Sequence, residues 1–159
     1  MLKRVAQDAR AVVELAVQEA RQDGSGIVEA EHLLLALSDD PEGRFLDLDR
    51  EQIKDALTEE SRASLQAVGI DADTDALRAL GAPCPAGFND DPRFAASAKL
   101  ALNRGLRIAA GEGKRSYGRR EVLLGVLAAD NGRVPRALAI AGIDIEQLRA
   151  QAWRQTPLR

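Results

Sequence analysis

The stretch "EAEHLLLAL" (residues 29–37) places the only histidine of the chain, His32, directly after Glu31 at the head of an aliphatic run. Two interpretations are open. A metal or acid–base site would use Glu31 and His32 as its chemical groups, whereas the start of a buried helix would use them as polar groups that stabilise the helix end. Because the run is apolar nearly all round after His32, it predicts a short, central and buried helix over residues 30–38.

The same pattern returns 89 positions further along the chain. The segment "HLLLAL" (32–37) faces "EVLLGV" (121–126), and alanine-rich segments upstream of both match at the same offset. A third match, "GID" at 69–71 and 142–144, has an offset of 73, so the first copy carries 16 additional residues between its aliphatic run and this turn. The sequence therefore predicts a duplication with an insertion in its first copy.

Hydrophobic periodicity predicts an all-α fold, and no convincing alternating strand is present. The proline- and glycine-rich segment before the second copy is expected to be a linker. We expect a single domain over 1–159, made of a first repeat at about 5–80 with an inserted helix at about 39–60, a linker at 81–93, and a second repeat at about 94–155. The expected helices are 5–22, 30–38, 49–68 (one helix or two), one capped by Asp71 or Asp73, 94–110, 119–129, 134–141, and one from Asp144 to about 155.

The insertion in the first copy is acidic, and its segment 49–58 is amphipathic. This segment would either pack on its own domain or dock a partner. The residues alone leave both alternatives open.

Composition narrows the class of protein. Hydrophobic residues make up 45% and charged residues 30% of the 159 residues, which predicts an aliphatic core and not a disordered chain. The formal net charge of −3 gives no whole-chain sign of nucleic-acid binding. No apolar stretch approaches the ~20 residues that span a bilayer, and the N-terminus lacks the apolar region of a signal peptide. We therefore expect a cytoplasmic protein with neither nucleic-acid nor membrane partners.

Cysteine usage and composition add two expectations. Cys84 is the only cysteine, so the sequence offers no intrachain disulfide and no cysteine cluster for zinc. No cofactor or metal is expected. The abundance of alanine and arginine is typical of a high-GC bacterium.

These features resemble the Clp N-terminal repeat domain, which precedes the ATPase modules of the ClpA, ClpC and ClpB unfoldases. The resemblance rests on "EHLLLAL", the two "GID" turns, the alanine-rich opening helices and the duplication, and it covers residues 5–151. It implies two four-helix repeats related by a pseudo-twofold axis, and a role in docking substrates or adaptors. The segment "GEGKRS" (111–116) lacks the Ser or Thr of a nucleotide-binding P-loop. We therefore expect a stand-alone N domain without ATPase modules.

The resemblance also implies a role for Glu31. In ClpC-like domains this glutamate pairs with the guanidinium of phosphoarginine through two parallel hydrogen bonds, and the phosphate uses free amides at the same helix end. The residue-level alternative is a carboxylate stabilised by the helix dipole. Ala30 replaces the usual Thr or Ser, and in the second copy Arg120, preceded by Arg119, takes the glutamate position. That second position is expected to attract an anion and not a guanidinium.

For His32, a hydrogen bond near the helix start is the expected role. A zinc site needs three or four converging ligands, and side chains of consecutive residues on a helix point about 100° apart, which argues against a paired acid–base site with Glu31. The basic patch formed by Lys114, Arg115, Arg119 and Arg120 is either a solvated surface or an acceptor of anionic protein segments.

An apolar contact is implied at Phe94 and at its first-repeat counterpart Val5. In actinobacterial relatives of the Clp N domain, cyclic-peptide antibiotics bind in this region. The residue-level alternative for Phe94 is an anchor in the core.

Together these observations predict a non-enzymatic protein- or peptide-binding module. It would act with the Clp protease machinery as an adaptor, a decoy or a regulator of substrate recognition, with Clp unfoldase, adaptor or substrate proteins as partners. The alternatives are a sink that sequesters cyclic-peptide antibiotics and, in another class, a catalytic domain that uses Glu31 and His32.

Overall fold

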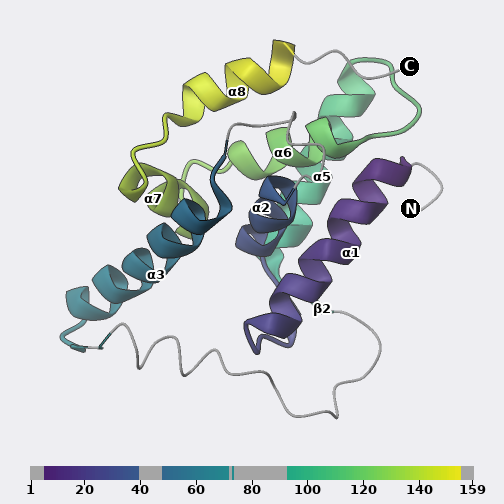
Figure 1. Cartoon of the computed structure of the whole chain (residues 1–159). Coiled ribbons are helices and arrows are strands. Elements are labelled where there is room, and N and C mark those ends of the chain that lie inside the picture. Colours follow the sequence, from purple (N-terminus) through teal and green to yellow (C-terminus); the bar gives the residue numbers. More distant parts are fainter. Residues whose placement is uncertain (1–5, 40–47, 72, 74–92, 155–159) are drawn as a thin grey trace.

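The computed structural model describes residues 6–39, 48–71, 73 and 93–154, and within them the predicted all-α fold is confirmed (Figure 1). The helix expected after Asp71 or Asp73 and the linker up to residue 92 lie outside the described residues. None of the described helices is both long and apolar enough to cross a membrane. The elements are α1 (Gln7–Gln22), β1 (Ile27–Val28), α2 (Ala30–Ser38), α3 (Arg50–Ala67), β2 (Arg93–Phe94), α5 (Ala96–Gly111), α6 (Arg119–Leu127), α7 (Arg133–Ile140) and α8 (Ile145–Arg154).

One pair of strands was not expected from the sequence. Strands β1 and β2 form a parallel pair in which Val28 lies opposite Phe94. Each strand has only two residues, which is too short to produce an alternating hydrophobic pattern. This strand pair joins the segment before the start of α2 to the segment before the start of α5, so it connects the two repeats.

The duplication is visible in matching helix bounds and reciprocal contacts. Helices α1 and α5 both have 16 residues, helices α2 and α6 both have nine, and each pair begins 89 positions apart. The Ala6 amide donates to the Tyr117 carbonyl at 3.0 Å, and the Ala95 amide donates to the Val28 carbonyl at 2.8 Å. These four residues are two pairs of counterparts. An exchange in which each copy makes the same contact to the other is what a twofold axis produces.

Helices α2 and α6 form the centre of the core. Every residue from Ala30 to Leu37 and from Arg120 to Leu127 is buried. In Figure 1, α2 lies between α1 on one side and α3 on the other, and α6 lies beside α5. The apolar character of the aliphatic run on nearly all sides is explained by this position, since each side of the helix meets another element.

The second repeat has a closer helix crossing than the first. A Cβ atom on Gly125 of α6 would lie 2.1 Å from the Ala101 carbonyl oxygen of α5. A Cβ on Gly105 of α5 would lie 2.5 Å from the Glu121 carbonyl oxygen of α6. The counterparts in the first repeat are alanines, so only the second repeat needs glycine to bring its two helices together.

The insertion is used mainly to lengthen one helix. Helix α3 has 18 residues, whereas its counterpart α7 has eight. Asp49 caps α3 by accepting hydrogen bonds from the Glu51 and Gln52 amides at 2.9 and 3.4 Å. Helix α3 is unbroken, it contacts α2 and α7, and Ile53 and Leu57 on it are buried. It therefore packs on its own domain, as one of the two sequence-based alternatives predicted.

Candidate functional site: the starts of helices α2 and α6

At the start of α2, His32 acts as a capping residue. Its Nδ1 atom accepts a hydrogen bond from the Glu29 amide at 2.9 Å, which assigns the imidazole proton to Nε2. That Nε2 atom faces a carboxylate oxygen of Asp23 at 3.6 Å. The interaction with His32 lowers the pKa of Asp23 below its ordinary value, although partial burial acts in the opposite direction. The expected hydrogen bond of His32 near the helix start is therefore present.

The start of α6 has the same capping hydrogen bond, made by a different type of residue. Glu121 is the counterpart of His32, and its Oε2 atom accepts a hydrogen bond from the Gly118 amide at 2.8 Å. Both side chains stand three residues after the cap, which is the position where a side chain reaches back to the free amide. The histidine after Glu31 thus performs the task that a carboxylate performs in the second repeat.

Each helix start is also capped by the opposite repeat. The Ser97 hydroxyl of α5 accepts a hydrogen bond from the Ala30 amide at 3.2 Å. An Asp8 carboxylate oxygen of α1 accepts one from the Arg119 amide at 3.0 Å. Ser97 and Asp8 are themselves counterparts. Sequence reasoning missed these caps, although the repeat alignment places a good capping residue at both positions.

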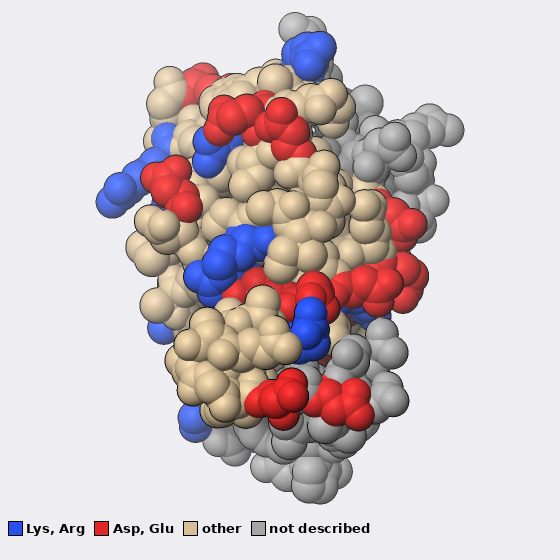
Figure 2. Space-filling model, turned by 90° about the vertical axis from the view of Figure 1, so that its left-hand side faces the viewer, with Lys and Arg blue, Asp and Glu red and all other residues tan. Residues whose placement is uncertain are grey.

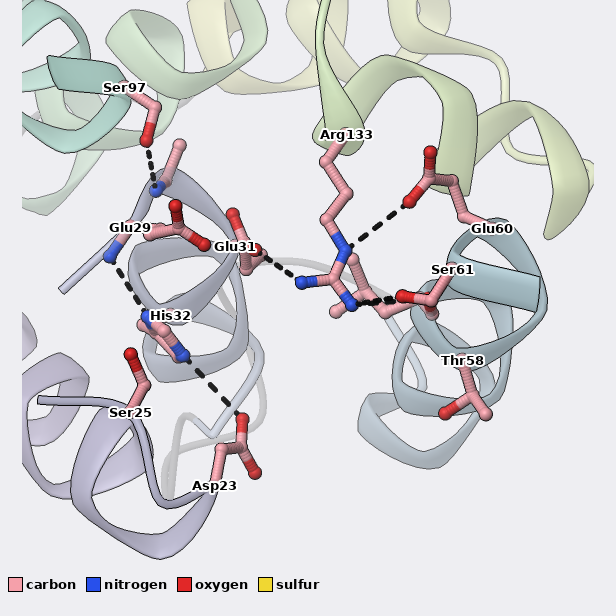
Figure 3. A network of polar contacts seen from close by, with 12 residues as sticks. Asp23, Ser25, Glu29, Glu31, His32, Thr58, Glu60, Ser61, Ser97 and Arg133 are labelled. Atoms are coloured by element: carbon pink, nitrogen blue, oxygen red, sulfur yellow. Dashed lines mark hydrogen bonds and ion pairs between the residues drawn. The ribbon is translucent and has the colours of Figure 1, made fainter. Parts of the chain in front are cut away.

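Glu31 is buried at the start of α2 and pairs with an arginine from the other repeat (Figure 3). Arg133, the first residue of α7, donates from Nη1 to Glu31 at 2.7 Å. Its Nη2 atom donates to the Ser61 hydroxyl at 2.6 Å and to the Leu57 carbonyl at 3.3 Å. Its Nε atom faces a carboxylate oxygen of Glu60 at 3.3 Å. The position that the family resemblance assigns to an incoming guanidinium is thus filled by this chain.

Glu60 of α3 completes the group around Arg133. It is buried, and it accepts hydrogen bonds from Arg136 Nε and from the Ser64 hydroxyl, both at 2.7 Å. Burial alone would raise the pKa of Glu60, but these hydrogen bonds and the two nearby arginines lower it. Aligned on the "GID" turns, Glu60 is the counterpart of Arg133. Equivalent positions of the two repeats therefore meet across the pseudo-twofold axis with opposite charges.

A second carboxylate, Glu29, lies beside Glu31. Figure 3 shows both side chains at the first turn of α2. Burial, and then the hydrogen bond with Glu31 and its charge, raise the pKa of Glu29 above the ordinary value of 4.5. The single arginine at Glu31 therefore leaves the first turn of α2 with an excess of negative charge.

Two pockets adjoin the Glu31–Arg133 pair. The first, of about 530 Å³, lies between the α2 start and α3 and is mainly acidic. Its charged lining residues are Asp23, Glu29, Glu31, Glu51, Asp55, Lys54 and Arg133. On the side of the molecule where α3 and α7 lie, Figure 2 shows acidic side chains forming a band with basic side chains set into it.

The second pocket, of about 400 Å³, lies between the α2 start, α5 and the beginning of α7. Leu100, Val126 and Pro135 give it an apolar lining, and Arg104 also lines it. Glu29, Glu31 and Arg133 line both pockets, so the Glu31–Arg133 ion pair is part of the boundary that the two pockets share.

At the start of α6, Arg120 is buried and already paired. It donates from Nε to Glu121 at 2.9 Å and contacts Glu112 through Nη2. Its guanidinium lies 5.4 Å from the centre of the Trp153 ring. Lys114 contacts the same two carboxylates at 2.8 and 2.9 Å. Burial would raise the pKa of Glu121, but bonds from Lys114, the Gly118 amide and Arg120 lower it.

The remaining predicted residues lie elsewhere. Phe94 is half-buried on β2 and packs against the core, while Val5 lies outside the described residues. The structure thus brings Glu31 and His32 together on one helix start and Arg119 and Arg120 on the other. Sequence reasoning missed Arg133, Glu60 and Ser61, and only the opposite charges at the Glu60 and Arg133 counterparts could have indicated them.

Comparisons with known proteins identify the fold. No family model and no curated protein match the sequence. Among solved structures, the chain is similar to the N-terminal domain of the caseinolytic protease associated chaperone ClpD from Arabidopsis thaliana, at a TM-score of 0.69 and 18% identity, covering 96% of this chain and 97% of that one. The Hsp104 N-terminal domain from Candida albicans matches at a TM-score of 0.61 and 14% identity, with coverages of 94% and 89%.

A chain from a malarial protein secretion system also matches, at a TM-score of 0.63 and 15% identity over 95% of this chain and 93% of that one. The chain therefore has the fold of a Clp N-terminal domain, which confirms the resemblance seen in the sequence.

Proposed function

We propose that this chain is a non-enzymatic module that binds proteins or peptides and works with Clp unfoldase or protease machinery. Besides the fold, one observation carries the proposal: the Glu31–Arg133 pair lies between an acidic pocket of about 530 Å³ and a more apolar pocket of about 400 Å³. Adjoining pockets of this kind suit a peptide segment with a cationic side chain beside an apolar one.

The likeness to the N-terminal domain of a protease-associated chaperone suggests the partners, namely Clp unfoldase subunits, their adaptors or their substrates. Within that system the module would act as an adaptor, a decoy or a regulator of substrate recognition. A cytoplasmic, bacterial setting is the expectation that goes with this function.

The geometry of His32 supports binding over catalysis. A general base needs a free nitrogen within reach of the proton that it removes. In this chain Nδ1 of His32 accepts the Glu29 amide proton and Nε2 faces Asp23. Ser25 also lines the acidic pocket, but its hydroxyl is already engaged, because it donates to the Ile27 carbonyl at 2.8 Å.

The proposal is tested by affinity capture with defined variants. Immobilised wild type, Glu31→Ala and a control, Glu14→Ala on the exposed side of α1, are incubated with host lysate, and Clp subunits, adaptors and substrates are quantified by mass spectrometry. We expect these proteins to be enriched by wild type and by the control, and to fall by about tenfold or more with Glu31→Ala, which corresponds to about 1.4 kcal/mol. Equal capture by all three proteins, or no Clp component at all, would contradict the proposal.

The antibiotic sink remains an alternative prediction that depends on Phe94. Its half-buried position against the core favours the anchor role. Saturable binding of a cyclic peptide that is lost in a folded Phe94→Ala variant would favour the sink over the protein-binding module.

A further inference from the structure

We propose that Asn131 and Gly132, which precede α7, form a modification site at which the folded chain deamidates without an enzyme. The reaction replaces the neutral amide of Asn131 with a carboxylate at the second pocket. The inference goes beyond the proposed function, because it concerns a chemical change of the chain itself and does not depend on any partner.

The chemistry needs only these two residues and water. Of the three asparagines in the sequence, only Asn131 is followed by glycine. The Gly132 amide nitrogen attacks the side-chain carbonyl carbon of Asn131, the new C–N bond closes a five-membered succinimide ring, and the side-chain nitrogen leaves as ammonia with the proton of the Gly132 amide. Water then opens the ring at either carbonyl group. One opening gives an aspartate, and the other gives an isoaspartate, in which the main chain runs through the side-chain carbonyl.

The first requirement is an accessible side chain next to an unengaged amide. Asn131 is exposed and lies in the bend between α6 and α7, outside both helices. Among the described residues, no hydrogen bond uses the Asn131 side chain or the Gly132 amide. Ring closure at this position therefore breaks no hydrogen bond of the fold.

The second requirement is the absence of a side chain after the asparagine, because a Cβ atom there crowds the attacking nitrogen. The fold itself imposes glycine at this position. Gly132 is the residue before the first turn of α7, and its φ of +123° is a conformation that residues with a side chain rarely adopt. The backbone geometry that begins α7 thus also leaves Asn131 open to attack.

Two comparable positions are protected by the structure. Asp23 and Gly24 could form the same ring, but the Gly24 amide donates to the Arg21 carbonyl at 3.1 Å. The Asp23 carboxylate faces His32 at 3.6 Å, an interaction that lowers the pKa of Asp23 and keeps it ionised, and an ionised carboxylate is a poor electrophile. Asn103 lies inside α5, where the helical hydrogen bonds hold the following amide.

Deamidation changes the charge of the second pocket. Its charged lining residues are Glu29, Glu31, Arg104 and Arg133, so two carboxylates are balanced by two arginines. Asn131 lines the same pocket, and a carboxylate in its place adds one negative charge. This charge lies just before the N-terminus of α7, where the helix dipole stabilises an anion. The chain therefore exists in two forms that differ by one charge at this pocket.

The experiment follows purified, folded wild type at neutral and mildly alkaline pH by mass spectrometry of its tryptic peptides. We expect the peptide that ends at Arg133 to acquire the mass of the acid, at least about tenfold faster than the peptide that contains Asn103. The rate should rise with pH, because the attacking nitrogen must lose its proton. Labelling by an isoaspartate methyltransferase should fall on the same peptide, and the aged protein should co-migrate with Asn131→Asp in isoelectric focusing.

Matched variants and the unfolded chain make the result specific. Asn131→Gln keeps the amide but requires a six-membered ring, so it should stop the change, whereas Asn103→Gln should not affect it. In urea, Asp23 loses its protection and should become labelled as well. The inference is overturned if Asn131 stays intact in the folded protein, if it reacts no faster than Asn103, or if Asp23 is labelled equally fast in the folded protein.

Discussion

The starts of α2 and α6 occupy equivalent places in the two repeats but balance their charges differently. Around α2, the buried carboxylate of Glu31 depends on one arginine from the opposite repeat. Around α6, the buried carboxylate of Glu121 is shared by Arg120 and Lys114, both from its own repeat. The second start is neutralised locally, whereas the first depends on a long-range contact beside two pockets. The first is therefore the start at which an external group could compete.

The largest expected effect concerns the closer helix crossing of the second repeat. Gly125→Ala places a methyl group where only 2.1 Å separates it from the Ala101 carbonyl oxygen, so α5 and α6 must move apart. We expect the free energy of unfolding to fall by about 3 kcal/mol, the upper end for overpacked cores. Urea unfolding measures this.

Gly111→Ala serves as the control for the glycine prediction, because nothing lies within 4 Å of a Cβ at that position. It should leave stability unchanged or slightly higher. A Gly125→Ala protein as stable as wild type would mean that the crossing is not tighter than its first-repeat counterpart.

The second prediction compares the two arginines directly. Arg133→Ala should lower the free energy of unfolding at neutral pH by about 2 kcal/mol. The reason is that buried Glu31 loses the one ion pair that it makes within the described residues. Arg120→Ala should cost about 1 kcal/mol, because Lys114 still contacts Glu121. Urea unfolding of both variants at the same ionic strength gives the difference. A larger loss from Arg120→Ala would reverse the contrast between the two starts.

The smallest expected effect is the pH dependence, and its sign differs between the starts. The raised pKa of Glu29 means that the folded state binds this proton more tightly, so its contribution falls as pH rises from about 4.5 through the folded pKa. The lowered pKa of Glu121 acts oppositely: its contribution is present above about 4.5 and is lost as pH falls through the folded pKa.

Glu29→Gln should therefore remove the decline just above pH 4.5, while Glu121→Gln should weaken the loss of stability in acid. Urea midpoints measured between pH 3 and 7 separate the two. A Glu29→Gln protein with the same pH profile as wild type would show that folding does not raise the pKa of Glu29.

The sequence predicted the parts of this structure that depend on local patterns. Helices α2 and α6 follow from aliphatic runs, Asp144 caps α8 as expected, and the duplication follows from two constant offsets. The contact between Glu31 and Arg133 spans 102 positions and crosses between repeats. Neither residue carries a local pattern that indicates the other. The two-residue strands escaped prediction because pairing of this length depends only on how the repeats are placed.

The reciprocal caps make each repeat depend on the other. Ser97 serves the start of α2 and Asp8 serves the start of α6, so each repeat supplies the acceptor that the other needs. A protein of one repeat could make both bonds only by meeting a second copy of itself in a symmetric dimer. The two repeats make the reciprocal contacts of such a dimer within one polypeptide, and each helix start has both of its caps only when the other repeat is packed against it.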